Sequence, residues 1–290
     1  MNRVLRRWPE ALITLLLAAA ALACLLPLVH ELMMAISSND AVLARQVGFL
    51  PIEPTINSFR EVFKDSSVLR SLVFSIYLTV IFTVIAMALT IACAYPLTRP
   101  ELKGRKFFTT VIVITMYFSG GILPLYVLIK TLGLLNSMWS LILPLAVSPY
   151  NLIILRTSLM TVPDSITESA LIDGASYFRI LVQIILPLSL PIIATLSLFY
   201  AVGRWNMFQD ALFYISDSKR WTLQLKLAYI IINNTSPEVF QLEGAAAGYR
   251  IVPAAMTAAT VIIATVPILV AYPWLQRYFI SGVMLGSVKG

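Results

Sequence analysis

Cysteine, histidine and charged residues are scarce in this chain. It has 2 cysteines and 1 histidine among 290 residues, and only 12% of the residues are charged. Cys24 and Cys93 both fall inside apolar runs, so a structural disulfide is not expected. The sequence has no zinc-type ligand spacing and no GxxxxGK[ST] phosphate-binding loop. It therefore predicts no metal site and no catalytic residue, and any nucleotide hydrolysis must come from another chain.

Apolar residues are abundant instead. They make up 59% of the chain, and the mean hydropathy is +0.86, which is too high for a soluble domain of this length. The formal net charge of +7 raises the question of nucleic-acid binding. The basic residues, however, occur in small groups at the ends of apolar runs, as is usual in membrane proteins. The composition indicates an integral membrane protein with no nucleic-acid partner.

Six apolar runs are long enough to cross a bilayer as helices. They form one predicted transmembrane domain over residues 1–290, with spans at about residues 11–36, 68–95, 107–132, 138–160, 188–212 and 251–274. Arg3, Arg6 and Arg7 precede the first run, which continues past Cys24 and is therefore too long for a signal peptide. By the positive-inside rule these arginines place the N-terminus in the cytoplasm. Six crossings then put the C-terminus there too, with external loops at 37–67 and 214–250 and a cytoplasmic loop at 161–187.

The third predicted span contains a helix-breaking sequence, Ser119-Gly120-Gly121 followed by Pro124. Such a sequence predicts a kinked or broken helix, which a membrane protein tolerates where the freed backbone faces protein or a water-filled cavity. Lining of a cavity and a simple packing kink both remain open.

Residues 161–191 interrupt the apolar pattern with a charged segment that fits two short helices joined by a glycine. Ser165 stands three residues before Glu168, which is capping-box spacing at a helix start. Asp173-Gly174 predicts the end of that helix, since glycine accepts the left-handed conformation common at a helix C-terminus. Ser176 then caps a second helix that continues to Pro187. Charges are costly in hydrocarbon, so the segment must lie on one aqueous face.

The pattern Glu168-Ser169-Ala170, Asp173-Gly174-Ala175, Leu186-Pro187 and Pro191 resembles the EAA loop of bacterial ABC-importer permeases, which docks onto the cytoplasmic ATPase. Ser169 replaces the usual alanine and Leu181 a frequent phenylalanine. The resemblance implies an all-α membrane protein with six transmembrane helices in a type I ABC-importer permease bundle. It also implies the following ATPase-coupling residues: Glu168, Ala170, Asp173, Gly174, Ala175, Phe178, Leu181 and Pro187.

The C-terminal tail carries a second resemblance. Taken alone it is a flexible, nearly uncharged segment. Its last five residues, however, are similar to the tail of the maltose importer's smaller permease subunit, which reaches into the ATPase dimer; the ATPase-contacting residues implied are Gly286, Ser287, Val288, Lys289 and Gly290. Residues 278–284 look most like the branch of the family that handles oligosaccharides and polysaccharides, including alginate.

These resemblances imply a permease subunit of a binding-protein-dependent ABC importer in the bacterial cytoplasmic (inner) membrane, carrying an oligo- or polysaccharide such as alginate. The implied partners are a second, different permease subunit, two ATPase subunits and an extracytoplasmic sugar-binding protein. The chain is then not an enzyme and holds no cofactor, while ATP and Mg bind to the partner ATPase.

Contact with the carbohydrate is expected from aromatic rings flanked by amide groups. The candidates for the substrate path are Tyr150, Asn151, Trp205 and Asn206. The same residues also suit an interfacial aromatic belt and interhelical hydrogen bonding. An alternative function is a secondary transporter driven by an ion gradient, a class that usually shows internal repeats and ionisable groups at mid-membrane. The sequence shows neither convincingly.

Overall fold

The computed structural model describes residues 7–235 and 254–287, and these two ranges contain helices and connecting turns but no β-strand. The chain divides into two compact units. One comprises Met1–Arg70 and Lys226–Pro267, and the other Ser71–Leu225 and Ile268–Gly290. The helices, with 3-10 and π turns as η, are α2 (Arg7–Ala35), α3 (Asn39–Leu43), α4 (Asn57–Lys64), α5 (Ser66–Ala94), η1 (Pro96–Thr98), α6 (Arg105–Tyr117), α7 (Ile122–Thr131), α8 (Met138–Ile142), η2 (Leu143–Leu145), α9 (Pro149–Leu159), α10 (Asp164–Ile172), α11 (Tyr177–Ile180), η3 (Leu181–Ile185), α12 (Leu186–Leu188), α13 (Leu190–Asn206), α14 (Gln209–Tyr214), η4 (Ser218–Arg220), α15 (Leu223–Thr235) and α17 (Ala254–Ser287).

Three helical segments are individually long and apolar enough to cross a membrane. They are Ala11–Ala35, Ser66–Thr98 and Ala254–Pro273, with mean hydropathies of 2.7, 2.5 and 2.2. They fall on the first, second and sixth predicted spans. Residues 251–253 of the sixth prediction lie outside the described residues.

Three further crossings are assembled from bent helix pairs. Arg105–Tyr117 with Ile122–Thr131 bends by 115°, Met138–Leu145 with Pro149–Leu159 by 51°, and Tyr177–Leu188 with Leu190–Asn206 by 83°. With each pair counted as one span, the described part of the chain holds six. The described residues are therefore all-helical, as predicted, and by length and composition they hold three unbroken candidate spans, or up to six if each bent pair is one span.

The break predicted in the third span is confirmed. Residues 118–121 leave the helix, and Gly121 at φ +82° precedes α7. The fifth predicted span, residues 188–212, is not one helix: α13 ends at Asn206, and α14 begins at Gln209. The first break holds Ser119, Gly120 and Gly121, a combination that commonly interrupts a helix.

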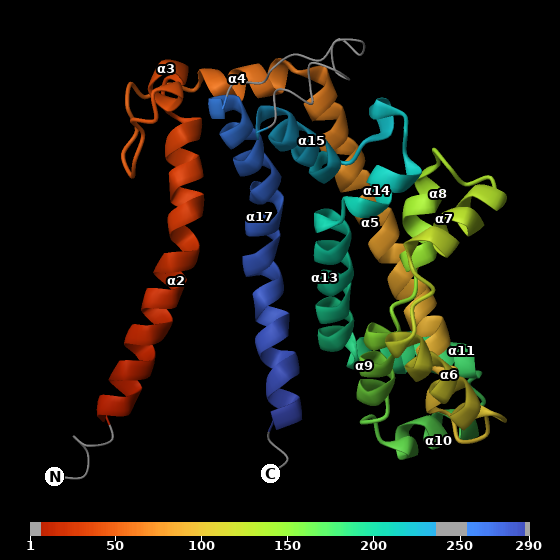
Figure 1. Cartoon of the computed structure of the whole chain (residues 1–290). Coiled ribbons are helices and arrows are strands. Elements are labelled where there is room, and N and C mark those ends of the chain that lie inside the picture. Colours follow the sequence, from red (N-terminus) through yellow and green to blue (C-terminus); the bar gives the residue numbers. More distant parts are fainter. Residues whose placement is uncertain (1–6, 236–253, 288–290) are drawn as a thin grey trace. The chain divides into compact units, whose positions relative to one another are not determined.

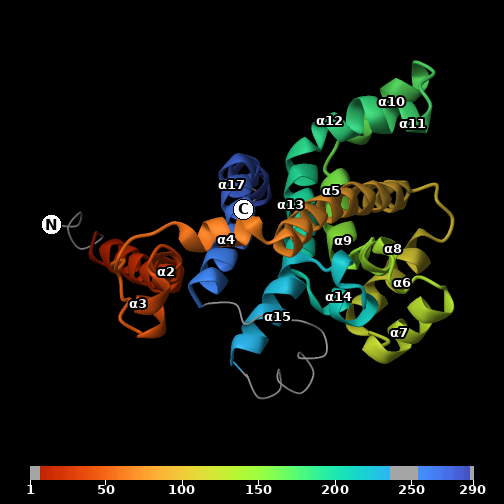
Figure 2. The ribbon, with the colours of Figure 1, turned by 90° about the horizontal axis from the view of Figure 1, so that it is seen from above.

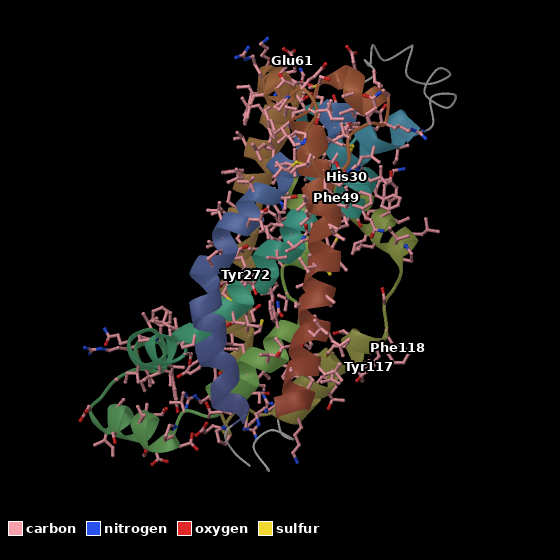
Figure 3. All side chains as sticks on the ribbon, turned by 90° about the vertical axis from the view of Figure 1, so that its left-hand side faces the viewer. His30, Phe49, Glu61, Tyr117, Phe118 and Tyr272 are labelled. Carbon is pink, nitrogen blue, oxygen red and sulfur yellow. The ribbon has the colours of Figure 1, made fainter. Side chains whose placement is uncertain are left out.

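The unit at residues 1–70 and 226–267 includes α2, α3 and α4. Ser37 ties the end of α2 to the following loop, since its hydroxyl donates to Met33 O at 2.7 Å and accepts from Ile52 N at 3.1 Å. His30 lies near Phe49 (Figure 3), and its Nδ1 is 3.2 Å from Gly48 O. The segment predicted as an external loop thus contains two short helices and is fixed to α2.

The core of the other unit packs α5, α9 and α13 together. Tyr200 on α13 is its polar centre: the hydroxyl lies 2.7 Å from Thr90 Oγ1 and accepts from Ser148 N at 3.0 Å. Its ring meets Phe82 edge-on, with centroids 6.0 Å apart. Figure 1 shows α6, α9, α10 and α11 at one end of this unit and α7, α8 and α14 at the other. The charged segment of residues 161–187 and the α13–α14 turn therefore lie at opposite ends.

Candidate functional site

The first helix of the charged segment, α10, begins at Asp164 after Pro163. Pro163 occupies the N-cap and makes no side-chain cap, so the capping box predicted from Ser165 and Glu168 is wrong: Ser165 already lies inside the helix. Proline suits this place because the residues at a helix start lack an acceptor for their N–H groups anyway. Asp164 instead supplies the negative charge that the helix dipole favours in the first turn.

The turn after α10 is a Schellman motif, as the Asp173-Gly174 pair predicts. Gly174 adopts φ +77°. Its N–H donates to Leu171 O at 3.0 Å, while Ala175 N donates to Ala170 O at 2.9 Å. These are the two bonds that define the motif, and they require a left-handed residue between them. The turn of this segment, which we call the hinge, is therefore held by two backbone hydrogen bonds and specified by glycine.

The second helix starts where the sequence predicts. Ser176 is its N-cap, and the Ser176 Oγ accepts from Arg179 N at 3.3 Å. The helix changes to a π turn at Leu181–Ile185, and Pro187 follows in the short α12. The helical segment ends at Leu188, with Ser189 as its C-cap, so its end lies one residue beyond the predicted stop at Pro187. Since proline lacks the N–H that would continue the ladder, a widened turn just before it is expected.

The predicted coupling residues divide into an outer and an inner set. Ala170 is buried, and Ala175 and Leu181 are half-buried. The exposed members are Glu168, Asp173, Gly174, Phe178 and Pro187. Large apolar side chains share this exposed surface: Phe178 is 75% exposed and Ile172 is 87% exposed. An exposed surface with both carboxylates and large apolar groups is typical of a protein-docking site.

The inner side of this segment is attached to the end of α5. Tyr95 Oη donates to Tyr177 O at 3.3 Å, and Arg99 Nη2 donates to Tyr95 Oη at 3.0 Å. The Arg99 guanidinium also lies 4.6 Å from the centroid of the Tyr95 ring. Ile180 is fully buried. The start of α11 is therefore joined to the end of α5 by a hydrogen bond, next to the buried Ile180.

Seen from above, α10 and α11 project sideways from the end of α13 instead of continuing its axis (Figure 2), in agreement with the 83° bend. An apolar groove of about 570 Å³ accompanies the junction and is lined by Ala92, Tyr95, Pro96, Arg99, Glu101, Leu102, Tyr177, Phe178 and Leu181. We call the whole segment 161–189 the coupling element.

The opposite end of the same unit holds a buried ion pair that sequence analysis missed. The side chains of Arg204 and Asp210 are only 0% and 10% exposed. Arg204 Nη2 donates to Asp210 Oδ1 at 2.9 Å, Nη1 donates to the other carboxylate oxygen, and Nη1 also donates to Leu141 O at 2.9 Å. The turn at Met207 and Phe208 folds Asp210 back onto Arg204, and this turn was not predicted.

The candidate substrate-path residues do not form one surface. Tyr150 is 57% exposed and Asn206 is exposed, whereas Asn151 and Trp205 are buried at 5% and 6%. Alternate faces of α9 and α13 explain this division, because adjacent residues on a helix point about 100° apart. Of the four candidates, only Tyr150 and Asn206 are exposed in the chain. Their role in the path stays a prediction.

The broken third span provides additional accessible groups. Residues 118–121 are exposed and non-helical, and Tyr117 and Phe118, at 78% and 77% exposed, stand where the chain leaves α6 (Figure 3). Exposed non-helical backbone is not tolerated against lipid tails. A pocket of about 240 Å³ adjoins this break and is lined by Ser119, Gly121, Ile122, Leu125, Ser140, Pro144, Leu145, Met207, Gln209, Asp210, Phe213 and Tyr214.

This pocket combines hydroxyl, amide and carboxylate groups with aromatic rings. Burial, together with the nearby Asp210 carboxylate, raises the pKa of Tyr214, so its hydroxyl stays protonated near neutral pH. Among the described residues no group of three or more metal-ligating side chains occurs. The pocket can form hydrogen bonds and stacking contacts, which suit the recognition of a polar solute.

The structure describes only some of the tail residues that are predicted to contact an ATPase. Gly286 and Ser287 lie at the end of α17, while Val288, Lys289 and Gly290 lie outside the described residues.

Comparisons with known proteins agree with this architecture. Residues 87–284 match the family model of the binding-protein-dependent transport system inner membrane component. The chain is 39% identical over 272 residues to the polygalacturonan/rhamnogalacturonan transport system permease protein YtcP of Bacillus subtilis, covering 93% of this chain and 94% of the relative. It is 41% identical over 255 residues to protein LplC of the same organism, covering 87% and 85%. A solved bacterial ABC transporter involved in the import of the acidic polysaccharide alginate matches with a TM-score of 0.85 and 28% identity, over 94% of this chain and 97% of the solved chain.

Proposed function

Because the chain belongs to the family of binding-protein-dependent transport system inner membrane components, we propose that it is one of two permease subunits of an importer for oligosaccharides derived from acidic polysaccharides. Family membership confirms the predicted ABC-importer permease with an all-α fold. The ATPase is a separate subunit, so the chain itself is not an enzyme. Membership also decides against the ion-driven secondary transporter.

The observation that carries the mechanism is the coupling element, whose turn is held by two backbone hydrogen bonds. Its exposed surface presents Ile172 and Phe178 on either side of the hinge at Gly174. Its inner side is bonded to α5 through Tyr95 and Tyr177. An ATPase that binds the exposed surface thus moves the helices packed against the coupling element. Packed helices shift between discrete arrangements rather than deforming continuously. Glu168 is exposed and available to pair with a basic group on that ATPase.

The remaining partners follow from this assignment. Two ATPase subunits bind ATP and Mg, a second and different permease subunit completes the path, and an extracytoplasmic sugar-binding protein delivers the substrate. The coupling element and both termini lie on the cytoplasmic side of the inner membrane in this arrangement. The tail residues Gly286–Gly290 add a second contact with the ATPase.

The proposed substrate class is supported by the proteins that resemble this chain and by the pocket beside residues 118–121, at the end of the unit opposite the coupling element. YtcP is a permease of a polygalacturonan/rhamnogalacturonan transport system, and the solved transporter is involved in the import of the acidic polysaccharide alginate. In this chain the exposed rings of Tyr117, Phe118 and Tyr150 offer stacking surfaces for sugar rings. The hydroxyl and amide groups of Ser119 and Gln209 in the neighbouring pocket supply hydrogen bonds.

The test is substrate-stimulated ATP hydrolysis by the reconstituted importer with its binding protein. Oligogalacturonates and neutral oligosaccharides of equal length are compared at the same concentration. We expect the anionic series to stimulate hydrolysis and to accumulate inside the vesicles. Stimulation by the neutral series alone would overturn the substrate class, and accumulation without nucleotide would overturn the importer mechanism.

A further inference from the structure

A third cavity, of about 500 Å³, lies between α6 and α9 and shares no lining residue with the two cavities described above. It is lined by Arg105, Lys106, Thr109, Thr110, Val113, Ile114 and Arg156. We propose that this cavity binds the phosphate headgroup and the first part of an acyl chain of an anionic phospholipid in the cytoplasmic leaflet. The leaflet rests on the proposed orientation, in which the end carrying α10 and α11 faces the cytoplasm.

The charge of the cavity calls for an anion. Three cations, Arg105, Lys106 and Arg156, line it, and no carboxylate does. None of the three forms an ion pair within the described ranges. Arg105 Nη1 donates to Thr98 O at 3.3 Å and Arg156 Nε to Leu97 O at 3.0 Å. These carbonyls orient the two guanidinium groups without neutralising them, so a bound anion relieves the mutual repulsion.

The start of α6 strengthens the same preference. Gly104 precedes the helix without a side-chain cap, and the first turn contains no acidic residue. The positive end of the dipole of a 13-residue helix therefore adds to the field of the cations. Lys106, exposed in the same turn, is the side chain free to reach a phosphate.

The polarity of the cavity lining changes along α6 in the same order as the polarity along a phospholipid molecule. Cations occupy the first turn, the hydroxyl-bearing Thr109 and Thr110 follow, and Val113 and Ile114 come one turn later. The distance from Arg105 to Ile114 is about 14 Å along the helix at 1.5 Å per residue. This order matches phosphate, glycerol ester and hydrocarbon. Inorganic phosphate would need only the first turn, whereas a lipid also uses the apolar wall. Basic pockets at the cytoplasmic ends of transmembrane helices are the usual sites for anionic headgroups.

The experiment measures lipid retention by the assembled importer, with both permeases and the ATPases, after release from nanodiscs of mixed phosphatidylglycerol and phosphatidylcholine. Native mass spectrometry counts the retained lipids in the absence of sugar and nucleotide. We expect selective retention of phosphatidylglycerol and a loss of about fivefold in the Lys106→Gln variant. Lys103→Gln is the matched control, because this exposed residue lies just before α6 and does not line the cavity. It should retain lipid as the wild type does.

A second variant separates a lipid from a free anion. Val113→Phe fills the apolar part of the cavity without changing its charge. It should therefore lower retention of phosphatidylglycerol while leaving the binding of inorganic phosphate to the cations unchanged. Equal retention of both lipids by the wild type would overturn the proposal. The same holds for equal effects of Lys103→Gln and Lys106→Gln, for a Val113→Phe variant that retains lipid normally, or for a cross-link from Lys106 to a carboxylate of the partner permease. Because no sugar is present, failure of the substrate assignment leaves this result unaffected.

Discussion

The hinge of the coupling element needs two things from Gly174: a left-handed backbone conformation and an N–H that donates to Leu171 O. Substitutions at this position distinguish between them. The residue adopts φ +77°, and an added Cβ would meet no heavy atom within 4 Å. Alanine therefore suffers only the cost of the left-handed conformation, about 1–2 kcal/mol. Proline is fixed near φ −65°, about 140° away from the observed angle. It also removes the N–H that donates to Leu171 O, which costs roughly 1 kcal/mol more.

The two variants should consequently differ in coupling rather than in insertion. Gly174→Ala keeps the hinge geometry and should transport normally with a slightly lower melting temperature. Gly174→Pro cannot keep α11 in place and should hydrolyse ATP with little uptake. We expect the sugar transported per ATP hydrolysed to fall at least about tenfold, since the proline penalty exceeds the roughly 1.4 kcal/mol that a factor of ten represents. The assay is uptake and phosphate release in proteoliposomes.

Gly133 provides the matched control for this experiment. It adopts φ +68°, and an added Cβ there would also meet nothing within 4 Å. The same pair of Schellman bonds surrounds it, from Gly133 N to Lys130 O and from Leu134 N to Ile129 O, both 3.0 Å. Gly133→Pro should therefore destabilise the protein to a similar extent without uncoupling it. A wild-type ratio in Gly174→Pro, or equal uncoupling in Gly133→Pro, would refute the assigned role of the hinge.

Two further predictions concern the polar core. Arg204→Met leaves the carboxylate of Asp210 buried without its partner and should lower the free energy of unfolding by about 3–5 kcal/mol; the double variant Arg204→Met/Asp210→Asn should recover part of that loss, and no recovery would mean that the pair does not act as a unit. Tyr200→Phe removes the acceptor of Ser148 N and the partner of Thr90, and should cost about 1–3 kcal/mol. Thermal unfolding in detergent measures both, and an unchanged melting temperature in Tyr200→Phe contradicts the hydrogen-bonded centre of the bundle.

Features that depend on neighbouring residues could be predicted from the sequence. The Asp173-Gly174 turn and the Ser176 cap are confirmed because glycine's left-handed conformation and a serine cap are decided within a few residues. The break at residues 118–121 is confirmed for the same reason. The capping box failed because Pro163, two residues upstream of Ser165, competes for the helix start.

Features that depend on distant segments could not be predicted. Arg204 and Asp210 are six residues apart, but their burial needs the carbonyl of Leu141 and the turn at residues 207–208. The hydrogen bond between Tyr95 and Tyr177 joins residues 82 positions apart, and no periodic pattern in the sequence predicts it. The division of the substrate-path candidates has the same origin, since composition selected Trp205 but only packing decides that its ring is buried.

The central claim is that the coupling element lies in the cytoplasm and receives mechanical work from a separate ATPase. A single cysteine at Ile172 tests it most directly, because this side chain is 87% exposed; Cys24 and Cys93, both free and exposed, are first replaced by serine. We predict that a membrane-impermeant maleimide labels this cysteine only when it has access to the cytoplasmic face, and that bound ATPase protects it. Labelling from the outside of intact cells, or labelling that is indifferent to the ATPase, would contradict the account.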